Sequence, residues 1–252
     1  MSGADSGWAG TARLERGVLT FTGRLGGAAA HAHAAVQVVT LTSGTVVFQD
    51  RYGHRLRATS AIIPAGVVHT VDATGQARGT TYYLDPAGRT AAALAARVSA
   101  AGDRRMASTW IAAAAAPLAS PPPGPLHPAL AALVRRASQG ARRAGGPDVP
   151  ESLAEAAAEV GLSITRLGHL FTDQLGLPYT AWRRWARLQH AMAAVHEGAT
   201  LTEAAHAAGF TDSAHLTRVC RAMFGITPTQ AARAAGWPPD PRSARRSGGS
   251  AL

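Results

Sequence analysis

Three histidines and one glutamine near the start of the chain have polar side chains that could act together on a ligand. His31, His33 and Gln37 fall at positions of the same parity, so on one β-strand their side chains would point to the same side. His69 follows a Pro-Gly turn in the run PAGVVH. Neutral imidazoles suit Zn, Fe, Ni or Cu. The same side chains could instead line an effector pocket or be hydrogen-bonded groups of the core.

The sequence around these histidines has the composition of β-strands. Between residues 13 and 84, short runs rich in Val, Thr, Ile and Tyr are broken by glycine and proline, as in VQVVTLTSGTVVFQD and GTTYYLDP. Short strands at regular spacing with turn residues between them predict a small sandwich or barrel.

The histidine pattern resembles the two motifs of the cupin barrel. The first motif has two His as H-x-H, a Glu four residues after the second His, and a Gly seven residues further on. Here Gln37 takes the place of the Glu, and Gly44 that of the Gly. The second motif, P-x-G-x-x-H, matches residues 64–69. The leading Gly of the first motif is out of register, and no Asn follows His69 by four.

In metal-binding cupins these positions ligate one divalent ion. The resemblance therefore implies a ligand set of His31, His33, Gln37 and His69. Glutamine lacks the negative charge of the usual glutamate, so we expect weaker metal binding. The alternative is that these side chains line the effector pocket, in which case no cofactor is required.

The C-terminal third contains an internal repeat. The stretch LAEAAAEVGLSITRLGHLFTDQLGLP begins at Leu153, and LTEAAHAAGFTDSAHLTRVCRAMFGITP follows the same plan from Leu201. In each copy a glycine, Gly161 or Gly209, ends one helix, and a Ser or Asp caps the next. Apolar residues then recur at helical spacing. Each copy predicts a helix, a short turn and a helix, the plan of the helix-turn-helix.

Residues 148–236 resemble the DNA-binding domain of the AraC/XylS family of bacterial transcription regulators. The most specific part is the second copy, with AAHAAGF, AHLTR and FGITP. A helix-like connector, PYTAWRRWARLQHAMAAVHEG, joins the two copies and would hold both second helices against successive major grooves. The resemblance implies sequence-specific promoter binding that controls transcription.

The resemblance also implies which side chains meet DNA. Those facing base edges are Thr165, Gly168, His169, Ser213, Ala214, Thr217 and Arg218. Arg218 is the strongest candidate, because arginine can donate two hydrogen bonds to guanine O6 and N7. The candidates for phosphate contacts are Arg166, Arg183, Arg184, Arg187 and Arg221. For the arginines of the connector, a solvated helix face is the alternative. Trp182, Trp185 and Cys220 are expected in the core.

Charge does not by itself support DNA binding. The net charge is +10, and all 25 basic residues are arginine. Residues 146–236, however, carry seven Arg against eight Asp and Glu, so the excess lies elsewhere, chiefly in 97–145. The single cysteine excludes an internal disulfide, and neither a membrane span nor a secretory signal is visible. We therefore expect a cytoplasmic protein.

The fold class expected is multidomain α and β. An N-terminal cupin-like barrel at 1–86 would sense an effector, and 87–145 would form a helical, Pro-rich linker. The DNA-binding domain with two helix-turn-helix motifs would occupy 146–236, followed by a disordered tail at 237–252. The expected partners are promoter DNA, a small-molecule effector, a second copy of the chain and RNA polymerase. The dimer is expected from apolar faces bearing Leu94 and Val98, and Leu130, Leu133 and Val134.

We predict a regulator rather than an enzyme. No nucleophile with its base, phosphate loop or cofactor fingerprint occurs in the sequence. The alternative is a metal-dependent cupin enzyme, such as a dioxygenase, carrying a DNA-binding module. That alternative depends on the three histidines and Gln37 alone.

Overall fold

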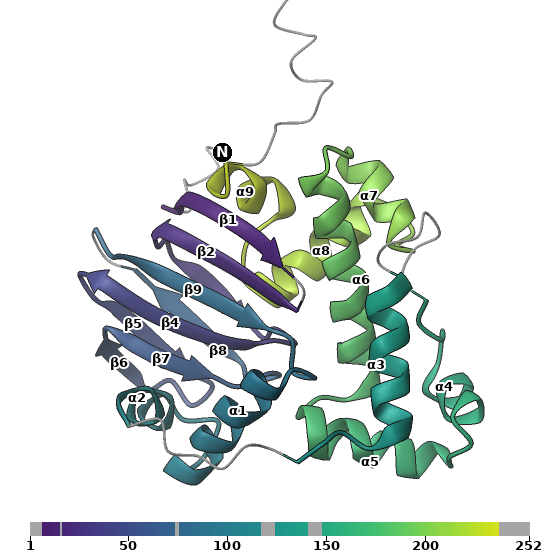
Figure 1. Ribbon diagram of the computed structural model, residues 1–252. Coiled ribbons are helices and arrows are strands. Elements are labelled where there is room, and N and C mark those ends of the chain that lie inside the picture. Colours follow the sequence, from purple (N-terminus) through teal and green to yellow (C-terminus); the bar gives the residue numbers. More distant parts are fainter. Residues whose placement is uncertain (1–6, 16, 74–75, 117–123, 141–147, 237–252) are drawn as a thin grey trace, which may run out of the picture.

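The protein has a β-rich N-terminal part and a helical C-terminal part (Figure 1). The computed structural model describes residues 7–15, 17–73, 76–116, 124–140 and 148–236. The expected tail at 237–252 lies outside the described residues, as does part of the expected Pro-rich break. No helix of the described ranges is long and apolar enough to cross a membrane.

Two antiparallel sheets form the N-terminal part. The first has the order β1 (Ala9–Glu15), β2 (Val18–Arg24), β9 (Arg78–Leu84), β4 (Val36–Ser43), β7 (Ser60–Ile63). The second has the order β3 (Ala28–His31), β8 (His69–Asp72), β5 (Val46–Asp50), β6 (Arg55–Ala58). The strands were expected from the Val- and Thr-rich runs. Among the described residues the two sheets do not join into the closed barrel that the sequence predicted.

Strand alternation sets what faces the core. In β5 every second side chain is buried, and in β9 the same alternation buries Tyr83 while Tyr82 stays exposed. Phe48 of β5 has no exposed surface, and Phe21 of β2 is 7% exposed. Alternating burial of this kind is what a sheet with one covered face requires.

Two helices cover the sheets near β7. They are α1 (Arg89–Ala101) and α2 (Ala107–Ala115), and both contact β7. The first turn of α2 is held by Asp50, whose Oδ2 accepts a hydrogen bond of 3.1 Å from the backbone N of Ala107. Trp110 of α2 is fully buried, and its indole N–H donates to the Arg104 carbonyl. Helix α2 was not expected from the sequence.

The helices expected to pair two copies of the chain are covered within one chain. Val98 of α1 is fully buried in the core that includes the sheets. Leu130 and Leu133 of α3 (Pro128–Gly140) are buried among helices of the C-terminal part. The observation that motivated a dimer, a free apolar face on these helices, does not hold in the structure.

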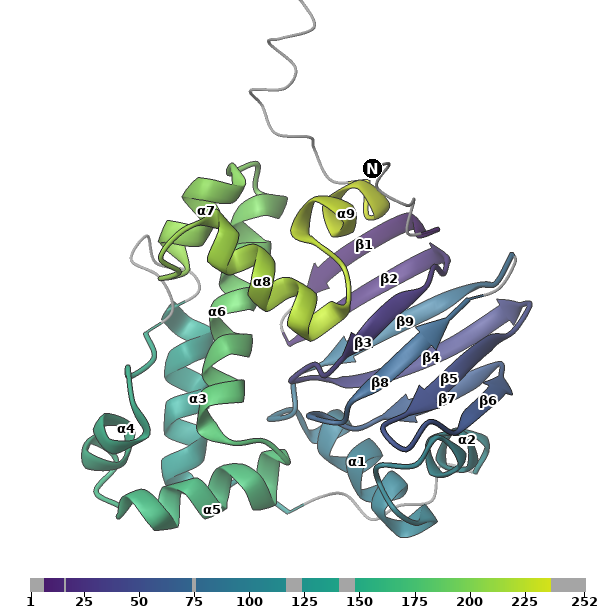
Figure 2. The same cartoon turned by 180° about the vertical axis from the view of Figure 1, so that it is seen from behind.

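The C-terminal part contains six helices among residues 148–236. They are α4 (Leu153–Glu159), α5 (Ile164–Leu175), α6 (Tyr179–His196), α7 (Leu201–Ala207), α8 (Ser213–Phe224) and α9 (Pro228–Ala234). Helix α6 connects the two repeated pairs, α4 with α5 and α7 with α8. Figure 2 shows α8 beside β3, and α8 and β3 are in contact. The short helix α9, which lies against β1, was also not expected.

Candidate DNA interface and histidine cluster

The turn between α7 and α8 is fixed by Gly209 and Asp212. Gly209 has a φ of 72°, in the left-handed region that glycine adopts at little steric cost. The Asp212 side chain accepts a hydrogen bond of 2.6 Å from the backbone N of His215, which caps α8. This bond from His215 holds the pKa of Asp212 below its ordinary value. Beyond the cap, one face of α8 is buried through Leu216, Cys220, Met223 and Phe224.

The pair α4 and α5 repeats these features. Gly161 has a φ of 66°, and Ser163 caps α5 by accepting a hydrogen bond of 3.2 Å from the Arg166 backbone N. The buried face of α5 consists of Leu167, Leu170, Phe171 and Leu175. Glu155 and Glu203 also have equivalent places, since each belongs to the capped first turn of its helix. The repeat in the sequence is therefore a repeat in local structure.

Most of the predicted contacts on α5 lie on its open side. Thr165, Arg166 and His169 are exposed. Gly168 is half-buried against α4, where an added Cβ would lie 3.5 Å from Leu153 Cδ2. Its small size therefore allows α4 and α5 to pack closely, and its contact with a base stays a prediction.

On α8 the exposed candidates are Ala214, Arg218 and Arg221. Ser213 and Thr217 are half-buried, and the Thr217 hydroxyl donates a hydrogen bond of 2.8 Å to the Ser213 carbonyl. Within the described part of the chain, Arg218 has no hydrogen-bond or ion-pair partner. Its guanidinium is therefore available to an external acceptor.

The arginines of α6 differ from one another in their surroundings. Arg183 forms an ion pair with Glu151. Arg187 donates a hydrogen bond of 2.9 Å to the Ala208 carbonyl, and its guanidinium lies 4.6 Å from the centre of the Phe210 ring. Arg184 is exposed. Arg187 thus holds the turn after α7, while its predicted phosphate contact stays a prediction.

The expected core residues of the helical part are buried. Trp182 and Trp185 are 2% and 1% exposed, which confirms that they are not stacking groups on the surface. Cys220 is 3% exposed, and burial raises the pKa of its thiol to about 12. A thiol with so high a pKa is not a reactive nucleophile at neutral pH.

The structure brings the three predicted histidines together. His31, His33 and His69 are all buried, and each offers a ring nitrogen within 4.8 Å of the others. Each ring donates from Nδ1 to a backbone carbonyl: His31 to Ala29, His33 to Ala35, and His69 to Val67. Carbonyl partners of this kind fix the tautomer that leaves the Nε2 lone pair free, as in many metal sites.

Burial keeps these imidazoles neutral. Burial and the neighbouring His33 lower the pKa of His31 to about 4. Burial also lowers the pKa of His33, and burial together with the other two rings holds the pKa of His69 well below its ordinary value. Neutral rings are the form that binds a metal ion.

Gln37 completes the cluster. Its Oε1 lies 2.9 Å from Nε2 of His33, and its Nε2 lies 3.3 Å from the Tyr83 hydroxyl. Because Nδ1 of His33 carries the proton, the lone pairs of Nε2 and Oε1 face each other. A cation bound by both atoms would remove the repulsion between these lone pairs. Rotation of the Gln37 amide, which would turn its N–H towards His33, would also remove it. The buried Nε2 of His69 has no hydrogen-bond partner either.

The cluster therefore fits a divalent ion in its chemistry. Three imidazoles and an amide oxygen could form a four-ligand set, after the rings move slightly inward to reach bond lengths of about 2.0 to 2.1 Å. Tyr83 would orient Gln37, a role that the sequence analysis missed. The alternation of β9, which turns Tyr83 inward, is the signal that could have found it.

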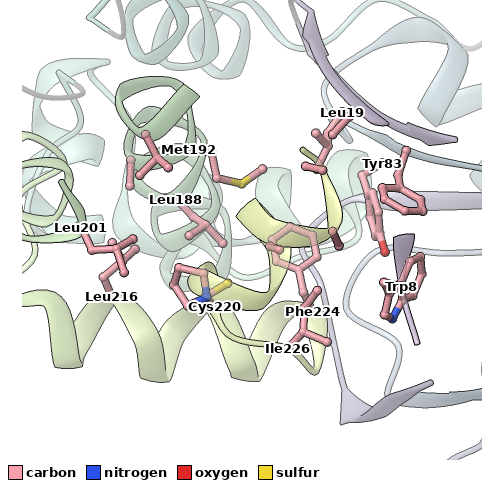
Figure 3. A pocket seen from close by; sticks show the side chains of 18 residues that line it. Trp8, Leu19, Tyr83, Leu188, Met192, Leu201, Leu216, Cys220, Phe224 and Ile226 are labelled. Carbon is pink, nitrogen blue, oxygen red and sulfur yellow. The ribbon is translucent and has the colours of Figure 1, made fainter. Parts of the chain in front are cut away.

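An apolar cavity lies between the first sheet and the C-terminal helices (Figure 3). It has a volume of about 90 Å³. Trp8, Leu19 and Tyr83 line it from the sheet side, and Leu188, Met192 and the buried face of α8 line it from the helical side. No charged side chain is among the described residues of its lining. The sequence analysis did not find this site, because its walls come from opposite ends of the chain.

Comparisons with known proteins agree with these features. A family model described as a helix-turn-helix domain matches residues 156–234. Solved structures of similar fold include ToxT from Vibrio cholerae O395, which is 7% identical with a TM-score of 0.55 over 88% of this chain and 99% of that one. No curated protein matches the sequence.

Two further ToxT structures contain ligands. One, from Vibrio cholerae strain SCE256 with an unsaturated fatty acid bound, is 8% identical, with a TM-score of 0.50 over 85% of this chain and 93% of that one. The other, from strain O395, is bound to (E)-4-(8-methylnaphthalen-1-yl)but-3-enoic acid. It is 9% identical, with a TM-score of 0.51 over 87% of this chain and 99% of that one. At these identities the likeness shows the fold.

The chain is thus a helix-turn-helix transcription regulator with a β-rich N-terminal domain and a helical C-terminal domain. The family match covers residues 156–234, and the motifs of the second repeat within it resemble those of the AraC family.

Proposed function

We propose that the protein controls transcription by placing α5 and α8 in successive major grooves of a promoter. The observation that carries this proposal is the repeated pair of helices. In both pairs the second helix is capped by a side chain at the equivalent position, and it has one buried face and one open face. Helix α6 has 18 residues, so its length is about 27 Å at 1.5 Å per residue. One turn of B-DNA is about 34 Å, and a modest bend of the duplex offsets the difference.

Selection from random duplexes with the full-length protein, followed by footprinting, tests this proposal. We expect two protected half-sites about one helical turn apart. Contact through α8 alone would protect a single half-site, and in that case α5 would not be a second reader.

The effector that we propose is a small, apolar molecule in the cavity of Figure 3. The lining supports this, because it is apolar and comes from both domains, so a ligand there would change how α8 sits against the sheet. The ToxT structures with an unsaturated fatty acid and with an aryl butenoic acid lend support from proteins of similar fold.

Thermal unfolding and DNA binding with benzene, a small uncharged apolar probe, test the effector proposal. We expect benzene to raise the melting temperature of the full-length protein and to change its DNA affinity, since both effects follow from preferential binding to one state. Ala191→Trp should remove both responses, because Ala191 lines the cavity and is 1% exposed. Benzene that leaves stability and DNA affinity unchanged would contradict the proposal.

We also propose that His31, His33, Gln37 and His69 bind a divalent metal ion. The cluster is buried, with His33 fully so and His69 at 1% exposure. Closed sites of this kind stabilise a fold, whereas catalytic sites keep an open position. Burial thus favours a structural metal over the alternative of a metal-dependent enzyme.

Metal analysis separates these outcomes. We expect the full-length protein to take up about one equivalent of Zn²⁺ with a rise in melting temperature, and His69→Ala to lose both effects. Stoichiometric metal with oxygen uptake on candidate substrates would support the enzyme instead. No uptake of Zn²⁺, Fe²⁺, Ni²⁺ or Cu²⁺ would leave the histidines as polar groups of the core.

A further inference from the structure

One side chain, Tyr83 of β9, belongs both to the surroundings of the histidine cluster and to the apolar cavity. Its hydroxyl lies 3.3 Å from Nε2 of Gln37, which is its cross-strand partner in β4. Its ring is part of the cavity lining shown in Figure 3. The candidate metal site and the cavity are therefore neighbours, and Tyr83 contacts both.

The Tyr83 ring packs against a candidate metal ligand and against α8. Its centre lies 5.4 Å from that of the His33 ring and 5.1 Å from that of Phe224 in α8, and both pairs are edge to face. Phe224 also lines the cavity. Tyr83 is only 8% exposed, and in so closely packed a place a shift of the ring moves its neighbours.

The side-chain amide of Gln37 has two orientations, and they differ in what they ask of Tyr83. In the orientation of the structure, Oε1 faces Nε2 of His33, and the amide N–H donates to the Tyr83 hydroxyl. After rotation, the N–H would donate to His33 and Oε1 would accept from the Tyr83 hydroxyl. A divalent ion is bound by Oε1 and not by the N–H, so it selects the first orientation.

The cavity lies beside Tyr83 in this same arrangement, in which the hydroxyl accepts from Gln37. A metal ion stabilises the arrangement from the side of Gln37. An apolar ligand that fills the cavity stabilises it from the side of the ring. Two ligands that prefer one state of a protein strengthen each other's binding by the same factor.

We propose that Tyr83 couples the two sites, so that a divalent ion bound by the histidines and Gln37 strengthens the binding of an apolar ligand in the cavity. Tyr83 is a positioning residue, because it acts on the metal through Gln37 and on the ligand through the shape of the cavity. This inference rests on the metal site and the effector cavity of the proposed function, and it does not require DNA. The response of the protein to its effector then depends on the supply of metal.

Calorimetric titration of the full-length protein with benzene, with and without bound Zn²⁺, tests the coupling. We expect Zn²⁺ to tighten benzene binding by at least about fivefold, the lower end of typical couplings between sites, and benzene to tighten Zn²⁺ binding by the same factor. If both bind but neither changes the affinity of the other, the coupling is wrong while both sites stand. If Zn²⁺ or benzene does not bind at all, the coupling fails together with the corresponding part of the proposed function.

Two tyrosine variants test whether Tyr83 carries the coupling. Tyr83→Phe keeps the ring and removes the hydroxyl, so both ligands should still bind while the coupling factor falls to about one, the value for independent sites. Tyr82→Phe is the matched control, because it removes the same hydroxyl from the adjacent position of β9, which is 38% exposed, and should keep the coupling. Weaker packing alone would lower the two affinities without removing the effect of one ligand on the other.

A second connection between the sites is the segment that carries two of the histidines. The backbone N of Ala32, between His31 and His33, donates a hydrogen bond of 3.2 Å to the Ala222 carbonyl of α8. Full coupling in Tyr83→Phe would place the effect in this segment and overturn the assignment of Tyr83.

The visible spectrum of bound Co²⁺ provides a direct signature, since it depends on the ligand geometry at the metal. Benzene should change the Co²⁺ spectrum of the wild type and of Tyr82→Phe, and should leave that of Tyr83→Phe unchanged. A spectral change of equal size in the two variants would contradict the proposal, as would a wild-type spectrum that benzene does not alter.

Discussion

Arginine side chains of the C-terminal domain differ in what their neighbours leave them free to do. Arg183 is paired with Glu151, and Arg187 lies over Phe210 while it donates to the Ala208 carbonyl. Arg218 has no such partner among the described residues. The sequence places all three on helices and shows their charge, but it does not show which acceptors lie within reach. Those acceptors come from the turn after α7 and from the segment before α4, and only the folded chain brings them close.

We predict that Arg218→Ala weakens binding to the selected duplex by about 1 to 3 kcal/mol and relaxes preference at one base position. Loss of two hydrogen bonds to a guanine is the physical reason. Affinities for the selected and a scrambled duplex at two salt concentrations provide the measurement.

The control for Arg218 is Arg187→Ala, which removes a packed guanidinium. We expect it to lower the melting temperature, because it loses the contacts with Phe210 and the Ala208 carbonyl, without a change at one base position. A folded Arg218→Ala protein that keeps full affinity and base preference would rule out α8 as the specific reader.

The pKa values of the buried histidines predict a loss of stability in acid. Unfolded histidine takes up a proton near pH 6.5, whereas burial lowers the pKa of folded His31 to about 4. Between these values the unfolded state binds more protons, so the free energy of unfolding should fall as pH falls from about 6.5 towards about 4. Urea unfolding of the metal-free protein across this range measures it.

His31→Gln should reduce the slope of this pH dependence, since one of the three buried rings is removed. His127→Gln is a control, because His127 is only half-buried and precedes α3, in another part of the chain. A wild-type stability that stays constant over the range would contradict the burial of neutral imidazoles.

At the scale of elements, the two ends of α8 have different contacts. Its N-terminus is capped by Asp212 in the turn. Its C-terminus ends at Gly225, which has a φ of 69° and lies against the backbone of Ala29. A glycine in the left-handed region is a common end of a helix, and the sequence shows this glycine. Its contact with β3 was not predicted, because the sequence contains no signal for the side of the N-terminal domain on which α8 lies.

We predict that Gly225→Ala destabilises the protein more than Gly161→Ala. Both glycines have left-handed φ values, so both substitutions carry a backbone cost of about 1 to 2 kcal/mol. At Gly161 nothing lies within 4 Å of the added Cβ, whereas at Gly225 the Ala29 carbonyl lies 2.8 Å away. Chemical denaturation of both variants measures the difference. Equal losses would show that α8 moves away from β3 without cost.

Several elements could be predicted from sequence, and the reasons for the exceptions are physical. The repeated pairs were found because their glycines, caps and apolar spacing are local signals. Helix α2, with the sequence ASTWIAAAA, was missed because it has no capping side chain of its own. Its first N–H is satisfied by Asp50, 57 residues earlier. Likewise the histidines could be grouped by motif, but their tautomers depend on carbonyls that only the fold positions.

At the scale of the whole molecule, the two hydrophobic cores do not follow the boundary between the domains. One core joins the sheets to α7, α8 and the part of α6 that begins at Trp185 and includes Leu188. The other joins α3, α4 and α5 to the start of α6, including Tyr179 and Trp182. The second helix pair is therefore packed against the N-terminal domain, while the first pair has a core of its own. Helix α6 passes from one core into the other.

This division predicts that the two helix pairs open independently. Leu167 and Leu216 occupy equivalent places in the repeat, are 0% and 2% exposed, and belong to different cores. Truncating either to alanine should cost about 2 to 5 kcal/mol locally. Leu167→Ala should then speed hydrogen exchange in α3, α4 and α5, because regions with separate cores unfold as separate units.

Leu216→Ala should instead speed exchange in α7, α8 and the strands that pack on them, while α4 and α5 keep their protection. Each variant thus serves as the control for the other, and exchange read by mass spectrometry on peptides of the full-length protein resolves the two regions. If both variants gave the same pattern over the whole helical part, the C-terminal domain would unfold as one unit. The first helix pair could then not move relative to the second pair, which is packed on the sheet, when the protein binds DNA.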